Sequence, residues 1–313
     1  MISLPDLHQR LIDQKCRTIA LQAPEGLKRY LPRLAGELRN LGYEVIISGD
    51  PCYGACDLDL RARDMADVLV HIGHTPVDET KGVLYELWPV DGDLSVISQV
   101  IPRLAGKKVG LVTTVQHIHL LSDAAEILRH AGIEPVIASP SPRTPCNGQV
   151  LGCSFDAARK TQAEEIIFLG TGLFHPTGIK LATGARVFAC DPITGRIEEP
   201  DADRLLRVRF GLIQKAQSAE SYGIIVSSKT GQCRSALADH LCRLSDKAYK
   251  IMLREVTPDQ LLNLGFPCYV NTACPRLAYD DQVRFSVPIL TPIEFEIVCG
   301  VRDFEHYRVD EIV

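Results

Sequence analysis

The segment Gly54-Ala55-Cys56-Asp57 follows an apolar run at 45–47 and precedes a charged stretch with a helical pattern. A second segment, Leu151-Gly152-Cys153-Ser154, also follows an apolar run, at 136–138. Ten residues after each cysteine an alanine opens a further strand pattern, and seventeen residues after each cysteine stands a glycine, Gly73 or Gly170. We interpret the two cysteines as one position of an internal repeat that the chain uses twice.

Strand and helix patterns alternate around both segments. In the first unit, short apolar runs at 18–21, 44–48, 67–72 and 83–87 are separated by segments of helical character. The same plan returns 90 residues later, and the offset grows to 97 inside the cysteine loop, so the second unit carries an insertion at 139–149. A third unit begins near residue 223, and its last strand is expected at 285–290.

Alternating strands and helices are typical of parallel sheets with helical crossovers. We therefore predict an α/β fold of three repeated Rossmann-like units, each a small parallel sheet flanked by helices. The units are expected in a pseudo-three-fold arrangement around a shared centre. Their predicted limits are residues 1–105, 106–221 and 222–313, each close to the usual size of a domain.

Composition excludes several classes of protein. The chain has 313 residues, of which 46% are hydrophobic and 23% charged, as in an ordinary globular protein. No apolar run approaches the ~20 residues of a membrane span, and the opening residues lack the basic and apolar regions of a secretory signal. The net charge of −5, without a dense Lys/Arg block, disfavours direct binding of nucleic acid. We expect a cytoplasmic protein.

Eleven cysteines in such a chain favour free thiols and metal binding over disulfides. Ligands of parallel sheets gather outside the carboxyl ends of the strands, where Cys56, Cys153 and Cys274 are expected. Three thiolates at a shared centre suit an iron–sulfur cluster, which would leave one iron open to a small molecule. Buried structural thiols are the simplest alternative, and structural zinc is disfavoured because tight C-x2-C pairs are absent.

The other eight cysteines share no register with these three. Cys52, Cys146 and Cys268 precede the candidate ligands by 4, 7 and 6 residues and are interpreted as ordinary thiols. The remaining five are predicted to be core residues: Cys16, Cys190, Cys233, Cys242 and Cys299.

Five segments together resemble the archaeal diphthamide synthase family, the 2-(3-amino-3-carboxypropyl)histidine synthases. They are Gln22-Ala23-Pro24-Glu25-Gly26-Leu27, Tyr53-Gly54-Ala55-Cys56-Asp57, Leu151-Gly152-Cys153, Ser227-Ser228-Lys229-Thr230-Gly231-Gln232 and Thr272-Ala273-Cys274-Pro275-Arg276. The resemblance implies a homodimer with a [4Fe–4S] cluster held by Cys56, Cys153 and Cys274, one from each unit. The C-x3-C-x2-C triplet of the usual radical enzymes is absent.

The resemblance also implies a reaction. The family cleaves the Cγ–S bond of S-adenosylmethionine, and the resulting 3-amino-3-carboxypropyl radical adds to C2 of a histidine in translation elongation factor 2. This is the first step of diphthamide biosynthesis, and it releases 5′-methylthioadenosine. An electron donor is required, and the sequence does not identify it.

Several residues are candidates for holding S-adenosylmethionine. Ser227, Ser228, Gly231 and Gln232 are expected to open a helix, where free backbone N–H groups favour a carboxylate, and Lys229 adds charge. Glu25, His74 and Arg276 are further candidates near strand ends. The Ser-Lys-Thr-Gly segment also fits a plain turn between strand and helix, and Arg276 also fits an ion pair with Asp280 or Asp281.

Two other functions fit three cluster cysteines. A quinolinate synthase-like dehydratase would use the open iron as a Lewis acid and would need no S-adenosylmethionine. A non-catalytic cluster-bearing partner would only bind the elongation factor or relay electrons. The signature of quinolinate synthase is not apparent, whereas the diphthamide-type segments are present.

Overall fold

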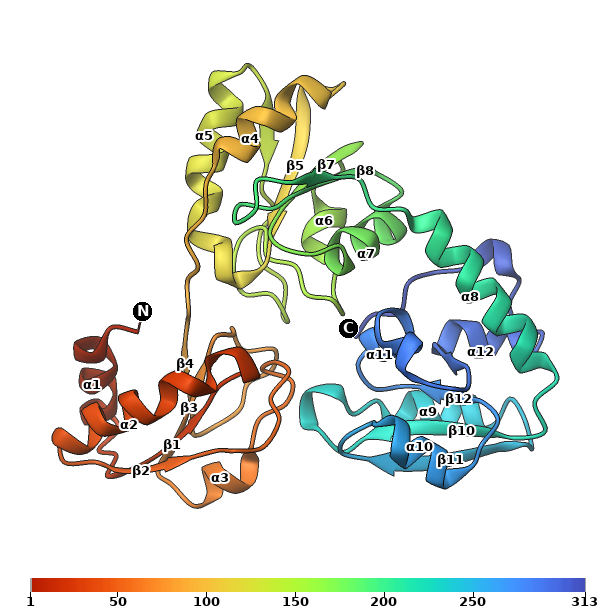
Figure 1. Cartoon of the computed structure of the whole chain (residues 1–313), viewed down its shortest axis with the longest axis horizontal. Coiled ribbons are helices and arrows are strands. Elements are labelled where there is room, and N and C mark those ends of the chain that lie inside the picture. Colours follow the sequence, from red (N-terminus) through yellow and green to blue (C-terminus); the bar gives the residue numbers. More distant parts are fainter. Residues whose placement is uncertain (1, 313) are drawn as a thin grey trace.

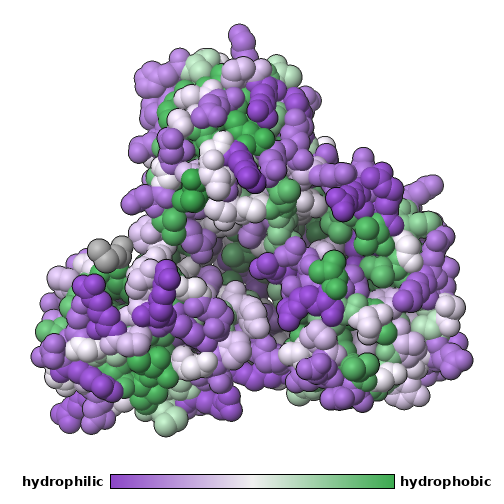
Figure 2. All heavy atoms as spheres, viewed as in Figure 1, coloured by the Kyte–Doolittle hydropathy of each residue, from purple (hydrophilic) through white to green (hydrophobic). Residues whose placement is uncertain are grey.

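The computed structural model describes residues 2–312, which form three lobes at the corners of a triangle (Figure 1). Each lobe contains its own sheet, and the long helix α8 (Ala202–Gln217) connects the second lobe to the third. Figure 2 shows a hollow where the three lobes meet, while much of the outer surface is hydrophilic. No helix among residues 2–312 is long and apolar enough to cross a membrane.

The first lobe has a parallel sheet in the order β2-β1-β3-β4. Its strands are β1 (Thr18–Gln22), β2 (Glu44–Ile47), β3 (Val68–Ile72) and β4 (Val83–Glu86). Its helices are α1 (Leu4–Asp13), α2 (Leu31–Asn40), which follows a 3-10 turn η1 (Glu25–Tyr30), and α3 (Leu60–Asp64). Leu31, Leu34 and Leu38 of α2 are buried and pack against the sheet.

The second lobe repeats this sheet in the order β6-β5-β7-β8 and adds β9 in antiparallel orientation. Its strands are β5 (Lys108–Thr113), β6 (Glu134–Val136), β7 (Glu165–Leu169), β8 (Arg186–Cys190) and β9 (Ile197–Glu198). Its helices are α4 (Ser95–Val100), continued by η2 (Ile101–Arg103), then α5 (Leu121–His130) after η3 (Val115–Leu120), α6 (Asp156–Lys160) and α7 (Phe174–Thr183).

The third lobe has a parallel sheet in the order β11-β10-β12-β13. Its strands are β10 (Tyr222–Ser227), β11 (Ala248–Leu253), β12 (Tyr269–Asn271) and β13 (Ile289–Leu290). Its helices are α9 (Ser235–Cys242) after η4 (Thr230–Gln232), α10 (Pro258–Leu264), α11 (Arg276–Tyr279), η5 (Asp281–Arg284), α12 (Pro292–Val298) and η6 (Phe304–His306).

The internal repeat is visible in the backbone. The pair η1 and α2 returns as η3 and α5, ninety residues later at every boundary. The repeated glycines make the same hydrogen bond, because Gly73 N–H donates to the carbonyl of Glu86 at 2.7 Å and Gly170 N–H to that of Cys190 at 3.0 Å. The predicted fold class, three small parallel sheets flanked by helices, is confirmed.

One local prediction needs correction, and two elements were not predicted. The last strand is much shorter than 285–290, because the Gln282 side chain bonds the backbone at Val287 and Ile289 and curves the segment that precedes β13. Helix α7 was not predicted, because Gly178 interrupts its helical pattern. A Cβ at position 178 would lie 2.1 Å from Cζ of Phe155, so the glycine permits close packing of α7 against Phe155. Strand β9 was also not predicted.

Cys233 is exposed and is not a core residue, because it lies in the loop between η4 and the start of α9. The other four cysteines assigned to the core fit that interpretation. Cys190 is buried within a core, and Cys16, Cys242 and Cys299 are partly buried and pack against core clusters.

The C-terminal segment joins the second and third lobes. Arg234 of the third lobe pairs with Asp310 at 2.7 Å, and Ile312 N–H donates to the carbonyl of Cys153 at 2.8 Å. The C-terminus accordingly lies near the junction of the lobes (Figure 1). Within the third lobe, the fully buried Arg209 guanidinium pairs with the fully buried carboxylate of Glu294 at 2.5 Å.

Candidate metal centre

The three candidate ligands come from equivalent edges of three sheets. Cys56 lies between β2 and α3, Cys153 between β6 and α6, and Cys274 between β12 and α11. All three are partly buried free cysteines. Each follows the carboxyl end of a parallel strand, the edge at which α/β sheets bind ligands.

The three thiols lie close enough to influence one another. The pKa of Cys274 is raised to about 12, mainly by burial and also by the charges of Cys56 and Cys153. Burial also raises the pKa of Cys153 to about 11, and the charge of Cys56 acts in the same direction. Thiols in such a setting stay protonated unless a metal supplies positive charge, because metal binding requires and stabilises the thiolate.

The three candidate ligands supply one thiol from each lobe. Among residues 2–312, no three His, Cys, Asp or Glu side chains lie close enough to hold a single metal ion. A [4Fe–4S] cluster carries its iron atoms at separate corners, so its thiolate ligands bind different irons. One thiolate from each lobe therefore suits the donor set of such a cluster.

Gly231 and Gln232 bring the third lobe onto Cys56. The Gln232 Nε2 group donates a hydrogen bond to Cys56 Sγ at 3.2 Å. A Cβ on Gly231 would lie 2.5 Å from Cα of Cys56, so only glycine allows this approach of the two backbones. Both residues were predicted to hold S-adenosylmethionine, and the structure shows them in contact with a candidate ligand.

Lys229 joins the same two lobes through a buried ion pair. Its Nζ lies 2.8 Å from Oδ2 of Asp57, the neighbour of Cys56, and 2.8 Å from Oε1 of Glu255. Burial lowers the pKa of Lys229, but the hydrogen bond to Asp57 and the ion pair with Glu255 outweigh it and raise the pKa overall. The ammonium is therefore neutralised by protein carboxylates.

Ser227 and Ser228 do not open an α-helix as expected. A 3-10 turn, η4, follows them, and α9 begins only at Ser235. Ser227 Oγ accepts a hydrogen bond from Lys229 N–H at 3.1 Å, and Ser228 N–H donates to the carbonyl of Leu253 at 3.0 Å. The serine hydroxyl and these backbone N–H groups thus stabilise the turn itself.

Glu25 lies in the first lobe and Arg276 in the third. Glu25 begins η1 and is exposed, with an ion pair to Lys28 at 2.6 Å. Arg276 is also exposed and pairs with Asp280 at 2.7 Å, as the alternative interpretation proposed. It stands two residues after Cys274, and its charge lowers the pKa of that thiol slightly against the effect of burial.

A buried polar network holds the Cys56 loop and was only partly anticipated from the sequence. Gln22 Nε2 donates to the carbonyl of Asp57 at 2.8 Å, and Gln22 Oε1 is 3.0 Å from Nδ1 of His71. His71 Nε2 lies 3.0 Å from Nδ1 of His74. Burial lowers the pKa of His71 to about 3 and that of His74 to about 4, so both rings are neutral at pH 7.

Arg143 is a site residue that the sequence did not reveal. It lies in the insertion at 139–149, and its Nη2 donates to the carbonyl of Gly231 at 3.1 Å. The insertion itself was the available signal, because it occurs inside the cysteine loop of the repeat.

The three cysteines that precede the candidate ligands, Cys52, Cys146 and Cys268, differ in burial. Cys52 and Cys268 are buried, and burial raises the pKa of each to about 12. Cys146 is partly buried, and burial raises its pKa as well. Cys52 is the one nearest in sequence to a candidate ligand, and the charge of Cys56 contributes to its raised pKa.

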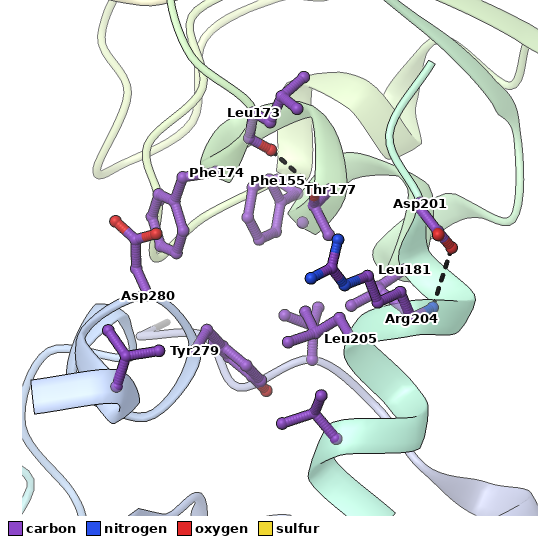
Figure 3. A pocket seen from close by; sticks show the side chains of 15 residues that line it. Phe155, Leu173, Phe174, Thr177, Leu181, Asp201, Arg204, Leu205, Tyr279 and Asp280 are labelled. Carbon is purple, nitrogen blue, oxygen red and sulfur yellow. Dashed lines mark hydrogen bonds between the residues drawn. The ribbon is translucent and has the colours of Figure 1, made fainter. Parts of the chain in front are cut away.

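A cavity of about 470 Å³ opens beside the Cys153 loop, between α7, α8 and α11. Figure 3 shows Phe155 and Phe174 on one side of it, with Leu205 of α8 and Tyr279 of α11 on the others. Gly152 lines it too, and a Cβ there would lie 2.2 Å from Cε1 of Phe174. The glycine before Cys153 therefore lets Phe174 pack against the ligand loop.

The chain resembles known proteins over nearly its whole length. A model of the diphthamide synthesis protein family matches residues 23–308. The 2-(3-amino-3-carboxypropyl)histidine synthase of Pyrococcus horikoshii is 38% identical over 308 residues, covering 95% of this chain and 89% of that protein. The protein of the same name from Methanocaldococcus jannaschii is 28% identical over 323 residues, covering 94% and 87%.

The fold is also that of a solved structure. The crystal structure of Dph2 from Pyrococcus horikoshii with a 4Fe-4S cluster matches this chain with a TM-score of 0.94 and 34% sequence identity. The match covers 100% of this chain and 94% of that chain.

Proposed function

Because this chain belongs to the 2-(3-amino-3-carboxypropyl)histidine synthase family, which acts in the first step of diphthamide synthesis, we propose its specific reaction. It transfers the 3-amino-3-carboxypropyl group of S-adenosylmethionine to C2 of a histidine in translation elongation factor 2. The other product is 5′-methylthioadenosine. The observation that supports this proposal is the set of three partly buried thiols at the carboxyl edges of the three sheets, one from each lobe.

Cys56, Cys153 and Cys274 are the proposed ligands of a [4Fe–4S] cluster. A solved relative carries a 4Fe-4S cluster, and the donor set of this chain fits one. When bound, the cluster supplies a low-potential electron and an open iron for reductive cleavage of a sulfonium. The Gln232 contact to Cys56 and the buried pair of Lys229 with Asp57 hold the Cys56 loop against the third lobe.

The bond that breaks depends on how S-adenosylmethionine is held, because orientation places one carbon of the sulfonium at the reacting centre. Among the predicted binding residues, Arg276 keeps an exposed guanidinium two residues from Cys274 and is our candidate for the substrate carboxylate. Ser228 is also exposed at the same edge. Ser227, Lys229, Gly231, Gln232 and Glu25 stay predicted contacts of S-adenosylmethionine.

The partners follow from the reaction. Elongation factor 2 is the protein substrate, and a one-electron donor must reduce the centre before each cleavage. We propose that the enzyme works as a homodimer in the cytoplasm, where its protein substrate acts in translation.

The product of an anaerobic reaction tests the proposed function. Purified enzyme is reconstituted with iron and sulfide, reduced with dithionite and incubated with S-adenosylmethionine, with and without the archaeal elongation factor. We expect 5′-methylthioadenosine by chromatography and an aminocarboxypropyl mass increase on one histidine of the factor. 5′-Deoxyadenosine as the main nucleoside would refute the mechanism. Absence of either nucleoside would favour the dehydratase or the non-catalytic partner.

A further inference from the structure

The insertion of the second lobe carries one side chain to the junction of all three lobes. Arg143 Nη2 donates to the carbonyl of Gly231 in the third lobe at 3.1 Å, and Gly231 packs directly against the backbone of Cys56. Arg143 Nη1 lies 3.8 Å from Oδ2 of Asp78 in the first lobe. The guanidinium is therefore fixed between lobes beside a candidate ligand.

Three arginines lie beside the candidate ligand loops, Arg143, Arg234 and Arg276, and the charge of Arg143 is the least compensated of the three. Arg234 pairs with Asp310 at 2.7 Å, and Arg276 pairs with Asp280 at 2.7 Å. The Asp78 carboxylate lies 3.8 Å from Arg143 and is more than half exposed to solvent. The buried Nε of Arg143 has no hydrogen-bond partner among residues 2–312.

The Arg143 side chain is also shielded from solvent, since only 11% of it is exposed. Its contact with Gly231 places this charge beside the segment that packs on the backbone of Cys56. A largely buried cation beside a ligand loop favours additional negative charge placed there, since electrostatic interactions are strong in a partly desolvated site.

We propose that Arg143 is the charge partner of the [4Fe–4S] cluster and that its guanidinium stabilises the reduced form, which raises the reduction potential. The inference rests on the proposed ligation by three cysteines and assigns a role to a residue outside them. One-electron reduction, by a low-potential one-electron donor, adds one negative charge to the cluster and its ligands. Net charge and hydrogen bonding are among the factors that set the potentials of such clusters.

A redox titration followed by EPR tests this role in the reconstituted full chain. Arg143→Gln removes the charge, and Arg143→Lys keeps it. Arg186→Gln is the matched control. Arg186 begins β8, at the amino ends of the strands and away from their carboxyl ends, where the ligand loops lie, and it pairs with Glu199 at 2.7 Å. The midpoint potential is read only from loaded protein, so a loss of cluster through a purely structural effect would not move it.

We expect Arg143→Gln to lower the ratio of reduced to oxidised cluster roughly tenfold at fixed potential, which corresponds to a midpoint about 59 mV more negative. Arg143→Lys should stay closer to the wild type than to Arg143→Gln, and Arg186→Gln should match the wild type. An unchanged midpoint in Arg143→Gln would overturn the proposal. So would an equal shift in Arg143→Lys, since the positive charge is then not the cause.

A second variant applies if Arg143→Gln retains no cluster. Asp78→Asn removes the carboxylate nearest to Arg143 and should move the midpoint to a more positive value, whereas no shift or a negative shift would overturn the proposal. Failure of the proposed function is distinguishable, because it would appear in the wild type as absence of the cluster or of S-adenosylmethionine cleavage. Failure of this inference alone leaves both intact.

Discussion

Substitution of Gly231 by alanine tests how the first and third lobes meet at the metal centre. The new Cβ would lie 2.5 Å from Cα of Cys56, 2.7 Å from its Cβ and 3.1 Å from its carbonyl oxygen. Backbone atoms cannot rotate away, and carbon atoms prefer separations of about 3.5–4.0 Å. The two loops must therefore separate by roughly an ångström, and such overpacking typically costs about 1–3 kcal/mol.

The separation should weaken the ligand set as well as the fold. The Gln232 hydrogen bond to Cys56 Sγ, now 3.2 Å, would lengthen, and Cys56 would move away from the other two thiols. We expect less iron per chain after anaerobic reconstitution, a lower midpoint of urea unfolding and reduced turnover.

Gly211→Ala provides the control for this variant. Gly211 lies inside α8, and a Cβ there meets nothing within 4 Å. Alanine is the better helix former by about 1 kcal/mol, so this variant should be as stable as the wild type or more stable, with full iron content. If Gly231→Ala also kept full iron content and an unchanged unfolding midpoint, the close approach of the two loops would be wrong.

Three further predictions concern the ligands, the open iron and the third lobe. Loss of any one proposed ligand should lower the iron and sulfide content and abolish turnover, as tested in Cys56→Ala, Cys153→Ala and Cys274→Ala. The visible absorbance of the cluster should remain in the control variants Cys52→Ala, Cys146→Ala and Cys268→Ala. A full cluster in Cys153→Ala would contradict one ligand per lobe. Addition of S-adenosylmethionine should alter the EPR spectrum of the reduced centre, because three thiolates leave one iron accessible; no change at saturating ligand would indicate a fourth protein ligand. Glu294→Gln should lower the free energy of unfolding by about 3–5 kcal/mol in a urea titration, because it leaves the fully buried Arg209 without its carboxylate. Glu220 is exposed, so the control Glu220→Gln should change this free energy by less than about 0.5 kcal/mol.

Periodicity in the sequence predicted those parts of the fold that depend on local pattern. The alternation of apolar runs with helical segments identified the units, and the offset of 90 residues relates α5 to α2. The capping box of α10 is also local, because Thr257 and Gln260 bond each other's backbone within one turn. Such features need no knowledge of how the lobes meet.

Contacts between lobes could not be predicted in this way. Lys229 reads as a free cation in the sequence, but the fold places it against Asp57, which lies 172 residues earlier. Arg143 is an ordinary loop arginine until its contacts with Gly231 and Asp78 are known. The exposure of Cys233 likewise depends on where α9 begins, which a helical pattern locates only within a few residues.

The central claim is that the enzyme breaks the Cγ–S bond of S-adenosylmethionine and transfers the aminocarboxypropyl group. Isotopic labelling tests it directly, with S-adenosylmethionine labelled either in the aminocarboxypropyl group or in the methyl group. Reduced enzyme, the archaeal elongation factor and each substrate are incubated without oxygen, and peptides of the factor are analysed by mass spectrometry. The account predicts that one histidine gains the label from the aminocarboxypropyl substrate alone. Transfer of the methyl label, or an unlabelled factor despite consumption of S-adenosylmethionine, would contradict it.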